Sequence, residues 1–131
     1  VAMSWVVLVS VLALLQFAAF GALVGCARGQ FGVSAPATTG HPIFERYYRV
    51  QYNTLEQIVV FVPALFLSAA YGFGEDWMSA ALGGVYLIGR QIYLASYVRD
   101  PKSRGLGFVM TVLPGAILLL NAAAGAVAAL R

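Results

Sequence analysis

The chain has 131 residues, of which 61% are hydrophobic and 10% are charged, and its mean hydropathy is +0.83. This composition excludes an ordinary water-soluble domain, in which about a quarter of the residues are charged. The net charge of +3 does not indicate nucleic-acid binding, because the basic residues are few and are not interleaved with aromatic residues on a polar surface. We therefore expect no nucleic-acid partner.

The length allows four membrane-spanning helices. A spanning helix needs about 20 mostly apolar residues, so four spans and short connections use the whole chain. We predict an all-α integral membrane four-helix bundle that forms one domain, residues 1–131. The expected helices are 3–26, 44–71, 77–98 and 106–130.

The first expected helix, 3–26, contains no charged residue. Gly, Ser, Pro and Thr are frequent from Arg28 to Pro42, and this composition predicts a loop. We expect His41, the only histidine, to be solvated in that loop. The single cysteine, Cys26, cannot form an internal disulfide.

The second expected helix, 44–71, has a charged first half and an apolar second half. Its length would be roughly 40 Å, which exceeds the hydrocarbon core of a bilayer. The charged end must therefore project beyond the lipid or face other helices. A short turn at 72–76 predicts an antiparallel hairpin with the third helix, and the polar segment 99–105 precedes the fourth.

The basic residues are distributed unevenly about this topology. In a bundle of four antiparallel spans, the first and third connections share one membrane face. Seven of the eight basic residues are at or near that face, and only Arg131 is opposite. The positive-inside rule then predicts both long loops in the cytoplasm and both termini outside. Because the chain is compact with short loops, we expect a bacterial inner-membrane protein.

Five polar residues in the second expected helix cannot be explained by topology alone. At 100° per residue they occupy about a third of the helix circumference and form one polar stripe. These residues are Arg46, Arg49, Asn53, Glu56 and Gln57.

The third expected helix repeats this pattern, since Tyr86, Arg90, Tyr93 and Tyr97 share one face. One interpretation is structural: Glu56 pairs with Arg90 or Arg49 across the bundle, and the tyrosines form an interfacial belt. However, ionisable residues within a membrane are by default functional, and one ion pair would account for only two of these side chains. The surplus indicates a ligand.

The side chains suggest what that ligand contains. Guanidinium groups bind carboxylates, Glu56 can bind an ammonium group, and Asn53 and Gln57 can bond an amide. A zwitterionic peptide with several carboxylates would satisfy this set, with a hydrophobic partner arriving from the lipid. We find no Ser-His-Asp or Cys-His arrangement and no metal-ligand spacing, and we expect no metal.

Two segments resemble the MAPEG family, the membrane-associated proteins of eicosanoid and glutathione metabolism. They are FERYYRVQYNTLE at 44–56 and RQIYLASY at 90–97, together with Arg104. The Thr38-Thr39-Gly40 segment is also similar to the first loop of that family. The resemblance covers the chain from about Arg28 to Arg104.

The resemblance implies a homotrimer of four-helix protomers, with reduced glutathione as cosubstrate bound between neighbouring subunits at the cytosolic side. It implies that Arg104 stabilises the glutathione thiolate and is the catalytic residue. Arg46 and Arg90 match packing or ion-pair residues. The implied glutathione contacts are Arg49, Gln51, Asn53, Glu56, Tyr93 and Tyr97, with Arg28 from the adjacent subunit.

The chain departs from the eicosanoid synthases of this family at two places. They carry an aromatic residue where this chain has Gln57, and a basic pair where it has Arg28-Gly29. We therefore expect a glutathione transferase that acts on lipophilic electrophiles, with reduction of lipid hydroperoxides as a second activity. The alternatives are a non-catalytic protein that binds lipid or glutathione, and a proton-coupled exporter using Glu56. Nearby arginines argue against the exporter because they would keep Glu56 ionised.

Overall fold

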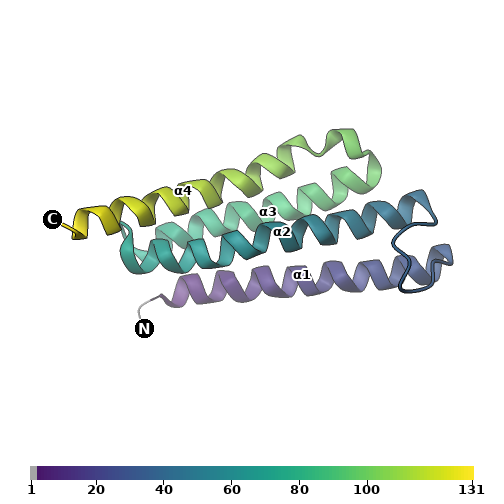
Figure 1. Cartoon of the computed structure of the whole chain (residues 1–131), viewed down its shortest axis with the longest axis horizontal. Coiled ribbons are helices and arrows are strands. Elements are labelled where there is room, and N and C mark those ends of the chain that lie inside the picture. Colours follow the sequence, from purple (N-terminus) through teal and green to yellow (C-terminus); the bar gives the residue numbers. More distant parts are fainter. Residues whose placement is uncertain (1–2) are drawn as a thin grey trace.

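A computed structural model of the chain describes residues 3–131. Val1 and Ala2, which belong to the expected domain 1–131, lie outside the described residues. The described part contains four long helices, a short 3₁₀ turn and no strand, so the predicted all-α four-helix bundle is confirmed (Figure 1). The elements are α1 (Ser4–Phe31), α2 (Pro42–Tyr71), α3 (Asp76–Arg99), η1 (Pro101–Ser103) and α4 (Gly105–Ala129).

The helices run antiparallel, with α2 and α3 in the middle of the bundle. α1 packs against one side of this central pair and α4 against the other (Figure 1). The α1–α2 and α3–α4 connections lie together at one end, which we call the loop end. The α2–α3 turn, the start of α1 and the end of α4 lie at the opposite end. This is the arrangement that the alternation of four spans predicts.

Within residues 3–131, three helical segments are long and apolar enough to cross a membrane, namely α1, α2 and the segment Pro101–Ala129 that contains α4. Helix α3, which carries Arg90 and Gln91, is not among these segments. Arg90, however, is fully buried inside the bundle.

All four helices expose apolar side chains on the outside of the bundle. Leu15, Val59, Ile88 and Leu120, one from each helix, are 60%, 64%, 58% and 71% exposed. An apolar exterior is the surface that a bilayer solvates. The exterior of α3 therefore matches that of the other three helices, and the chain is an integral membrane bundle.

Helix α1 continues to Phe31 and so ends five residues later than predicted, since the expected helix ended at residue 26. Gly32 ends it with a left-handed φ of 67°, and its N–H donates to the Arg28 carbonyl. The N–H of Val33 donates to the same carbonyl at 3.0 Å. Glycine is favoured at this position because it lacks the Cβ that disfavours positive φ. Gly29 thus lies within the helix and Gly32 ends it, so the loop begins later than the predicted start at Arg28.

His41 has a structural role that the expectation of a solvated side chain missed. Its Nδ1 accepts a hydrogen bond from the Ile43 N–H at 3.1 Å, which caps α2 ahead of Pro42 at the first helical position. Its ring stacks on that of Phe31 with centroids 4.1 Å apart. His41 therefore joins the end of α1 to the start of α2.

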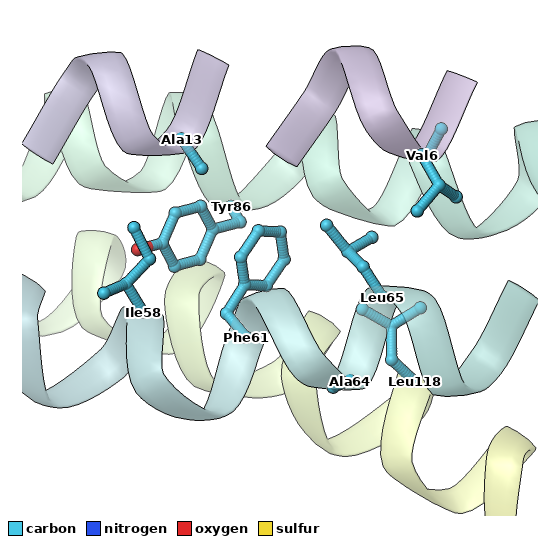
Figure 2. Packing of buried hydrophobic residues seen from close by; sticks show 9 residues of the cluster. Val6, Ala13, Ile58, Phe61, Ala64, Leu65, Tyr86 and Leu118 are labelled. Atoms are coloured by element: carbon cyan, nitrogen blue, oxygen red, sulfur yellow. The ribbon is translucent and has the colours of Figure 1, made fainter. Parts of the chain in front are cut away.

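The middle of the bundle is filled by apolar side chains from all four helices (Figure 2). Phe61 of α2 stacks on Tyr86 of α3 with centroids 3.7 Å apart. Ala13 of α1 and Leu118 of α4, both fully buried, belong to the same cluster. This cluster fixes the central pair of helices, on which most of the predicted site residues lie.

Candidate functional site

A pocket of about 410 Å³ opens at the loop end of the bundle. It lies among the start of α2, the end of α3 and the α1–α2 loop. Two of the predicted glutathione contacts, Arg49 and Tyr97, line it. The complete lining is Thr38, Pro42, Glu45, Arg46, Tyr48, Arg49 and Tyr97.

Arg46 connects the two helices that form this pocket. One guanidinium nitrogen, Nη1, donates to the carbonyl oxygens of Val98 at 2.9 Å and Arg99 at 3.1 Å. These carbonyls belong to the last turn of α3, where backbone acceptors lack helical partners and a positive charge is favourable. Arg46 thus binds backbone oxygens of α3, and it adds positive charge beside Arg49.

Glu45 connects the α1–α2 loop to the pocket. Its carboxylate accepts a hydrogen bond from the Gly40 N–H at 3.2 Å. Sequence reasoning gave no role to Glu45, to Tyr48 or to the loop residue Thr38. The spacing of Glu45 and Arg49, four residues apart in one helix, was a signal that could have placed both on one face.

Arg90 is the centre of a polar cluster inside the bundle. It is 0% exposed. Its Nε donates to Thr111 Oγ1 at 2.8 Å, and its Nη1 donates to Asn53 Oδ1 at 2.8 Å and to Thr54 Oγ1 at 3.1 Å. The two threonine hydroxyls donate to backbone carbonyls one turn earlier, so their oxygens remain available as acceptors. Arg90 therefore joins α2, α3 and α4 through uncharged oxygen atoms.

A chain of aromatic contacts leads from this cluster to the pocket. The Arg90 guanidinium lies 4.3 Å from the centroid of the Tyr93 ring, and the Tyr93 and Tyr97 rings stack at 5.5 Å. Tyr86 and Tyr93 are 0% exposed. The interpretation of the tyrosines as an interfacial belt is therefore wrong for these two residues.

Three buried polar atoms around Arg90 have no hydrogen-bond partner among residues 3–131. They are Arg90 Nη2 and the hydroxyl oxygens of Tyr86 and Tyr93. Buried polar groups normally have partners. This part of the bundle thus retains unused hydrogen-bonding capacity.

The polar stripe of α2 divides between two environments. Asn53 is buried against Arg90, whereas Arg49 and Glu56 are exposed. Gln57 lines a separate groove between α2 and α4. The interpretation that Glu56 pairs with Arg90 or Arg49 is not supported, because Glu56 forms no ion pair with any residue that the structure describes.

Two further predicted contacts, Arg28 and Gln51, lie outside the pocket of their own chain. Arg28 donates to the Ala37 carbonyl at 2.7 Å and lies 4.8 Å from the Phe44 ring centroid. Gln51 lies beside Gly21 at the α1–α2 contact.

The catalytic candidate, Arg104, also lies outside this pocket. It is exposed at the start of α4, with its guanidinium 5.6 Å from the Phe108 ring centroid. One chain therefore brings Arg49 and Tyr97 together, with Tyr93 and Asn53 behind them. Arg28, Gln51, Glu56 and Arg104 are left on other surfaces. Within residues 3–131, no group of three or more His, Cys, Asp and Glu side chains could hold a metal ion.

Comparison with known proteins identifies the family. The sequence model of the MAPEG family matches residues 6–124, which is nearly the whole chain. The chain belongs to the MAPEG family. The resemblance that the segments at 44–56 and 90–97 suggested is thereby confirmed.

Relatives of this MAPEG protein come from bacteria and mammals. An uncharacterized protein of Synechocystis sp. is 42% identical over 118 residues, covering 90% of this chain and 85% of the relative. Microsomal glutathione S-transferase 2 of Homo sapiens is 37% identical over 117 residues, covering 89% and 78%. Leukotriene C4 synthase of Bos taurus is 38% identical over 96 residues, covering 73% and 63%. These similarities place the chain in a family of membrane enzymes that use glutathione.

Proposed function

We propose that this protein is a membrane-bound glutathione transferase that conjugates the glutathione thiolate to lipophilic electrophiles. The observation that carries the proposal is the loop-end pocket, in which Arg49 and Tyr97 from the two characteristic segments come together with Arg46. Two guanidinium groups beside an aromatic hydroxyl suit a peptide with several carboxylates. The similarity to human microsomal glutathione S-transferase 2 supports the same ligand.

The positions of the remaining residues support a site completed by a second copy of the chain. Arg28 and Arg104 do not line the pocket of their own chain. We propose a homotrimer in which glutathione binds between neighbours. Arg49, Gln51, Asn53, Glu56, Tyr93 and Tyr97 would contact it from one protomer, with Arg28 contributed by the next.

The proposed chemistry requires the thiolate form of glutathione. A free thiol has a pKa of about 8.5 and is only a few per cent ionised at neutral pH. A guanidinium beside the sulfur favours the thiolate, and we assign this role to Arg104. The thiolate sulfur then forms a bond to the electrophilic carbon, and the leaving group departs with the electrons of the bond that breaks. The thiol proton passes to water.

A second activity would use the same bound thiolate. Two glutathione molecules would reduce a lipid hydroperoxide to an alcohol and water, and would themselves be oxidised to a disulfide. This reaction forms no conjugate. Assays for the conjugate and for glutathione disulfide therefore distinguish transferase from peroxidase activity.

The proposal is tested with protein purified in detergent, reduced glutathione and 1-chloro-2,4-dinitrobenzene. Wild type should form the conjugate, and Arg104→Ala should lose turnover while still binding glutathione. Lys102→Ala is the matched control, because Lys102 is an exposed cation two residues away and lies outside the pocket. Full activity in Arg104→Ala would refute the assigned role. Binding without turnover in wild type would instead support a non-catalytic protein.

We also propose that the loop end faces the cytoplasm of a bacterial inner membrane. Except for Arg90 within the bundle and Arg131 at the C-terminus, the arginines and the single lysine lie at or near the loop end. The positive-inside rule supports this orientation. It would also place the glutathione site in the cytoplasm.

A further inference from the structure

Arg90 is a buried cation whose partners among the described residues carry no charge. It is 0% exposed, and its three hydrogen bonds end on Asn53, Thr54 and Thr111. An arginine within a membrane bundle is costly and usually has a function. Since a well-packed apolar residue could fill the same space, packing alone does not explain why a guanidinium stands here.

The bond to Asn53 has a geometric consequence. A guanidinium carries only donors, whereas the asparagine side chain has one acceptor oxygen and one donor NH₂ group. The side-chain oxygen of Asn53 must therefore face Arg90, as it does at 2.8 Å. The NH₂ group is held away from Arg90, and none of the described residues accepts a hydrogen bond from it. Asn53 is thereby fixed as a donor toward whatever lies beyond it.

The same guanidinium also contacts the aromatic pair that leads to the pocket. It lies over the Tyr93 ring, and Tyr93 stacks on Tyr97, which lines the pocket. A cation over an aromatic face is an attractive interaction that depends on orientation. Arg90 thus holds both an amide on α2 and a ring on its own helix α3.

We infer that Arg90 is a positioning residue for glutathione, which it does not touch, and that it acts by fixing the Asn53 amide with its NH₂ group toward the ligand. This inference rests on the proposed function, because the ligand is the one proposed there. It assigns Arg90 a role beyond packing or ion pairing. Arg90 acts through Asn53, so the effects of the two residues on glutathione affinity are coupled.

A double-mutant cycle measures this coupling. The dissociation constant of reduced glutathione is determined by calorimetry for wild type, Arg90→Met, Asn53→Ala and the double variant in detergent. Each single variant should bind about tenfold more weakly, and the double variant should bind no more than about twofold more weakly than Asn53→Ala. If the two effects multiply, to about a hundredfold in the double variant, Arg90 does not act through Asn53 and the inference is overturned.

A matched control separates positioning from stability. Thr111→Val removes the acceptor of Arg90 Nε but leaves the Arg90–Asn53 bond in place. It should lower the melting temperature while changing the glutathione dissociation constant by less than about twofold. If Thr111→Val weakens binding as much as Arg90→Met does, the effect of Arg90 is only structural.

A second variant tests the inference even if Arg90→Met does not fold. Asn53→Asp keeps an acceptor for Arg90, adds an ion pair and removes the NH₂ donor. It should melt no lower than wild type and bind glutathione about tenfold more weakly. If Asn53→Asp binds glutathione as tightly as wild type, the inference on Arg90 is overturned but the proposed function is not. If wild type does not bind glutathione, both the proposed function and this inference are overturned.

Discussion

The backbone of Gly107 in α4 lies directly against that of Tyr93 in α3. A Cβ at Gly107 would lie 2.5 Å from the Tyr93 backbone nitrogen and 2.8 Å from the Gly89 carbonyl oxygen. Backbone atoms cannot move aside as a flexible side chain can. The absence of a side chain at Gly107 therefore allows α4 to approach the part of α3 that carries Tyr93.

Gly107→Ala should consequently separate α3 from α4 near the site. We expect a destabilisation of about 1 to 3 kcal/mol, the usual cost of overpacking, and weaker glutathione binding because Tyr93 shifts. Thermal unfolding and calorimetry in detergent measure the two effects. Gly115→Ala is the control in the same helix, because a Cβ there meets no atom within 4 Å. A Gly107→Ala protein as stable as Gly115→Ala would contradict the proposed close contact.

Arg49 should contribute directly to glutathione affinity, since it lines the pocket beside Tyr97. Arg49→Ala removes a carboxylate-binding group and is expected to weaken binding about tenfold or more, as loss of a charge-assisted hydrogen bond does. Arg49→Lys should recover only part of the affinity because lysine lacks the planar fork. Equal dissociation constants for wild type and Arg49→Ala would exclude Arg49 from the site.

His41 should stabilise the start of α2 through its N-cap. His41→Ala removes the acceptor for the Ile43 N–H and the stacking on Phe31, and should cost about 1 kcal/mol, as the loss of an N-cap does. His41→Asn should recover most of this loss because asparagine is a favoured N-cap. Melting temperatures in detergent check the order of the three proteins. If His41→Asn melts as low as His41→Ala, the cap contributes little.

The role assigned to Arg104 predicts a change in the pH dependence of turnover. A guanidinium near the sulfur lowers the pKa of the glutathione thiol, so the thiolate is present at lower pH. Arg104→Ala should therefore shift the rising limb of the kcat profile to higher pH, measured between about pH 6 and 9. If Arg104→Ala lowers kcat but leaves the rising limb of the profile at the same pH, Arg104 acts on a step other than thiol ionisation.

The proposed orientation is tested by cysteine labelling in intact cells. Cys26→Ser supplies a background without cysteine, since Cys26 is the only one. A membrane-impermeant maleimide should then label Glu75→Cys at the α2–α3 turn but not Lys102→Cys at the loop end. The opposite labelling pattern would reverse the orientation.

Much of the fold could be predicted from the sequence because it depends on local patterns. Apolar runs of spanning length and polar interruptions located four helices, and they gave the starts of α3 and α4 to within one residue. The end of α1 was misplaced because a glycine-rich composition does not show which glycine adopts a positive φ. That glycine is Gly32. The cap by His41 depends on the path of the loop and had no comparable signal.

The site was harder to predict because helical spacing shows which residues share one face of a helix but not which part of the protein that face packs against. Arg49, Asn53 and Glu56 share an arc of α2, yet only Asn53 is buried. The boundary between the interior and the exterior of the bundle passes through that arc. Spacing also could not reveal Thr111, since its hydroxyl reaches Arg90 from another helix.

The most direct test of the account is a calorimetric titration of the purified wild-type protein with reduced glutathione. We predict saturable binding that Arg49→Ala weakens about tenfold and that Lys102→Ala leaves unchanged. The absence of saturable binding to a folded wild-type protein would contradict the central claim that this MAPEG protein uses glutathione.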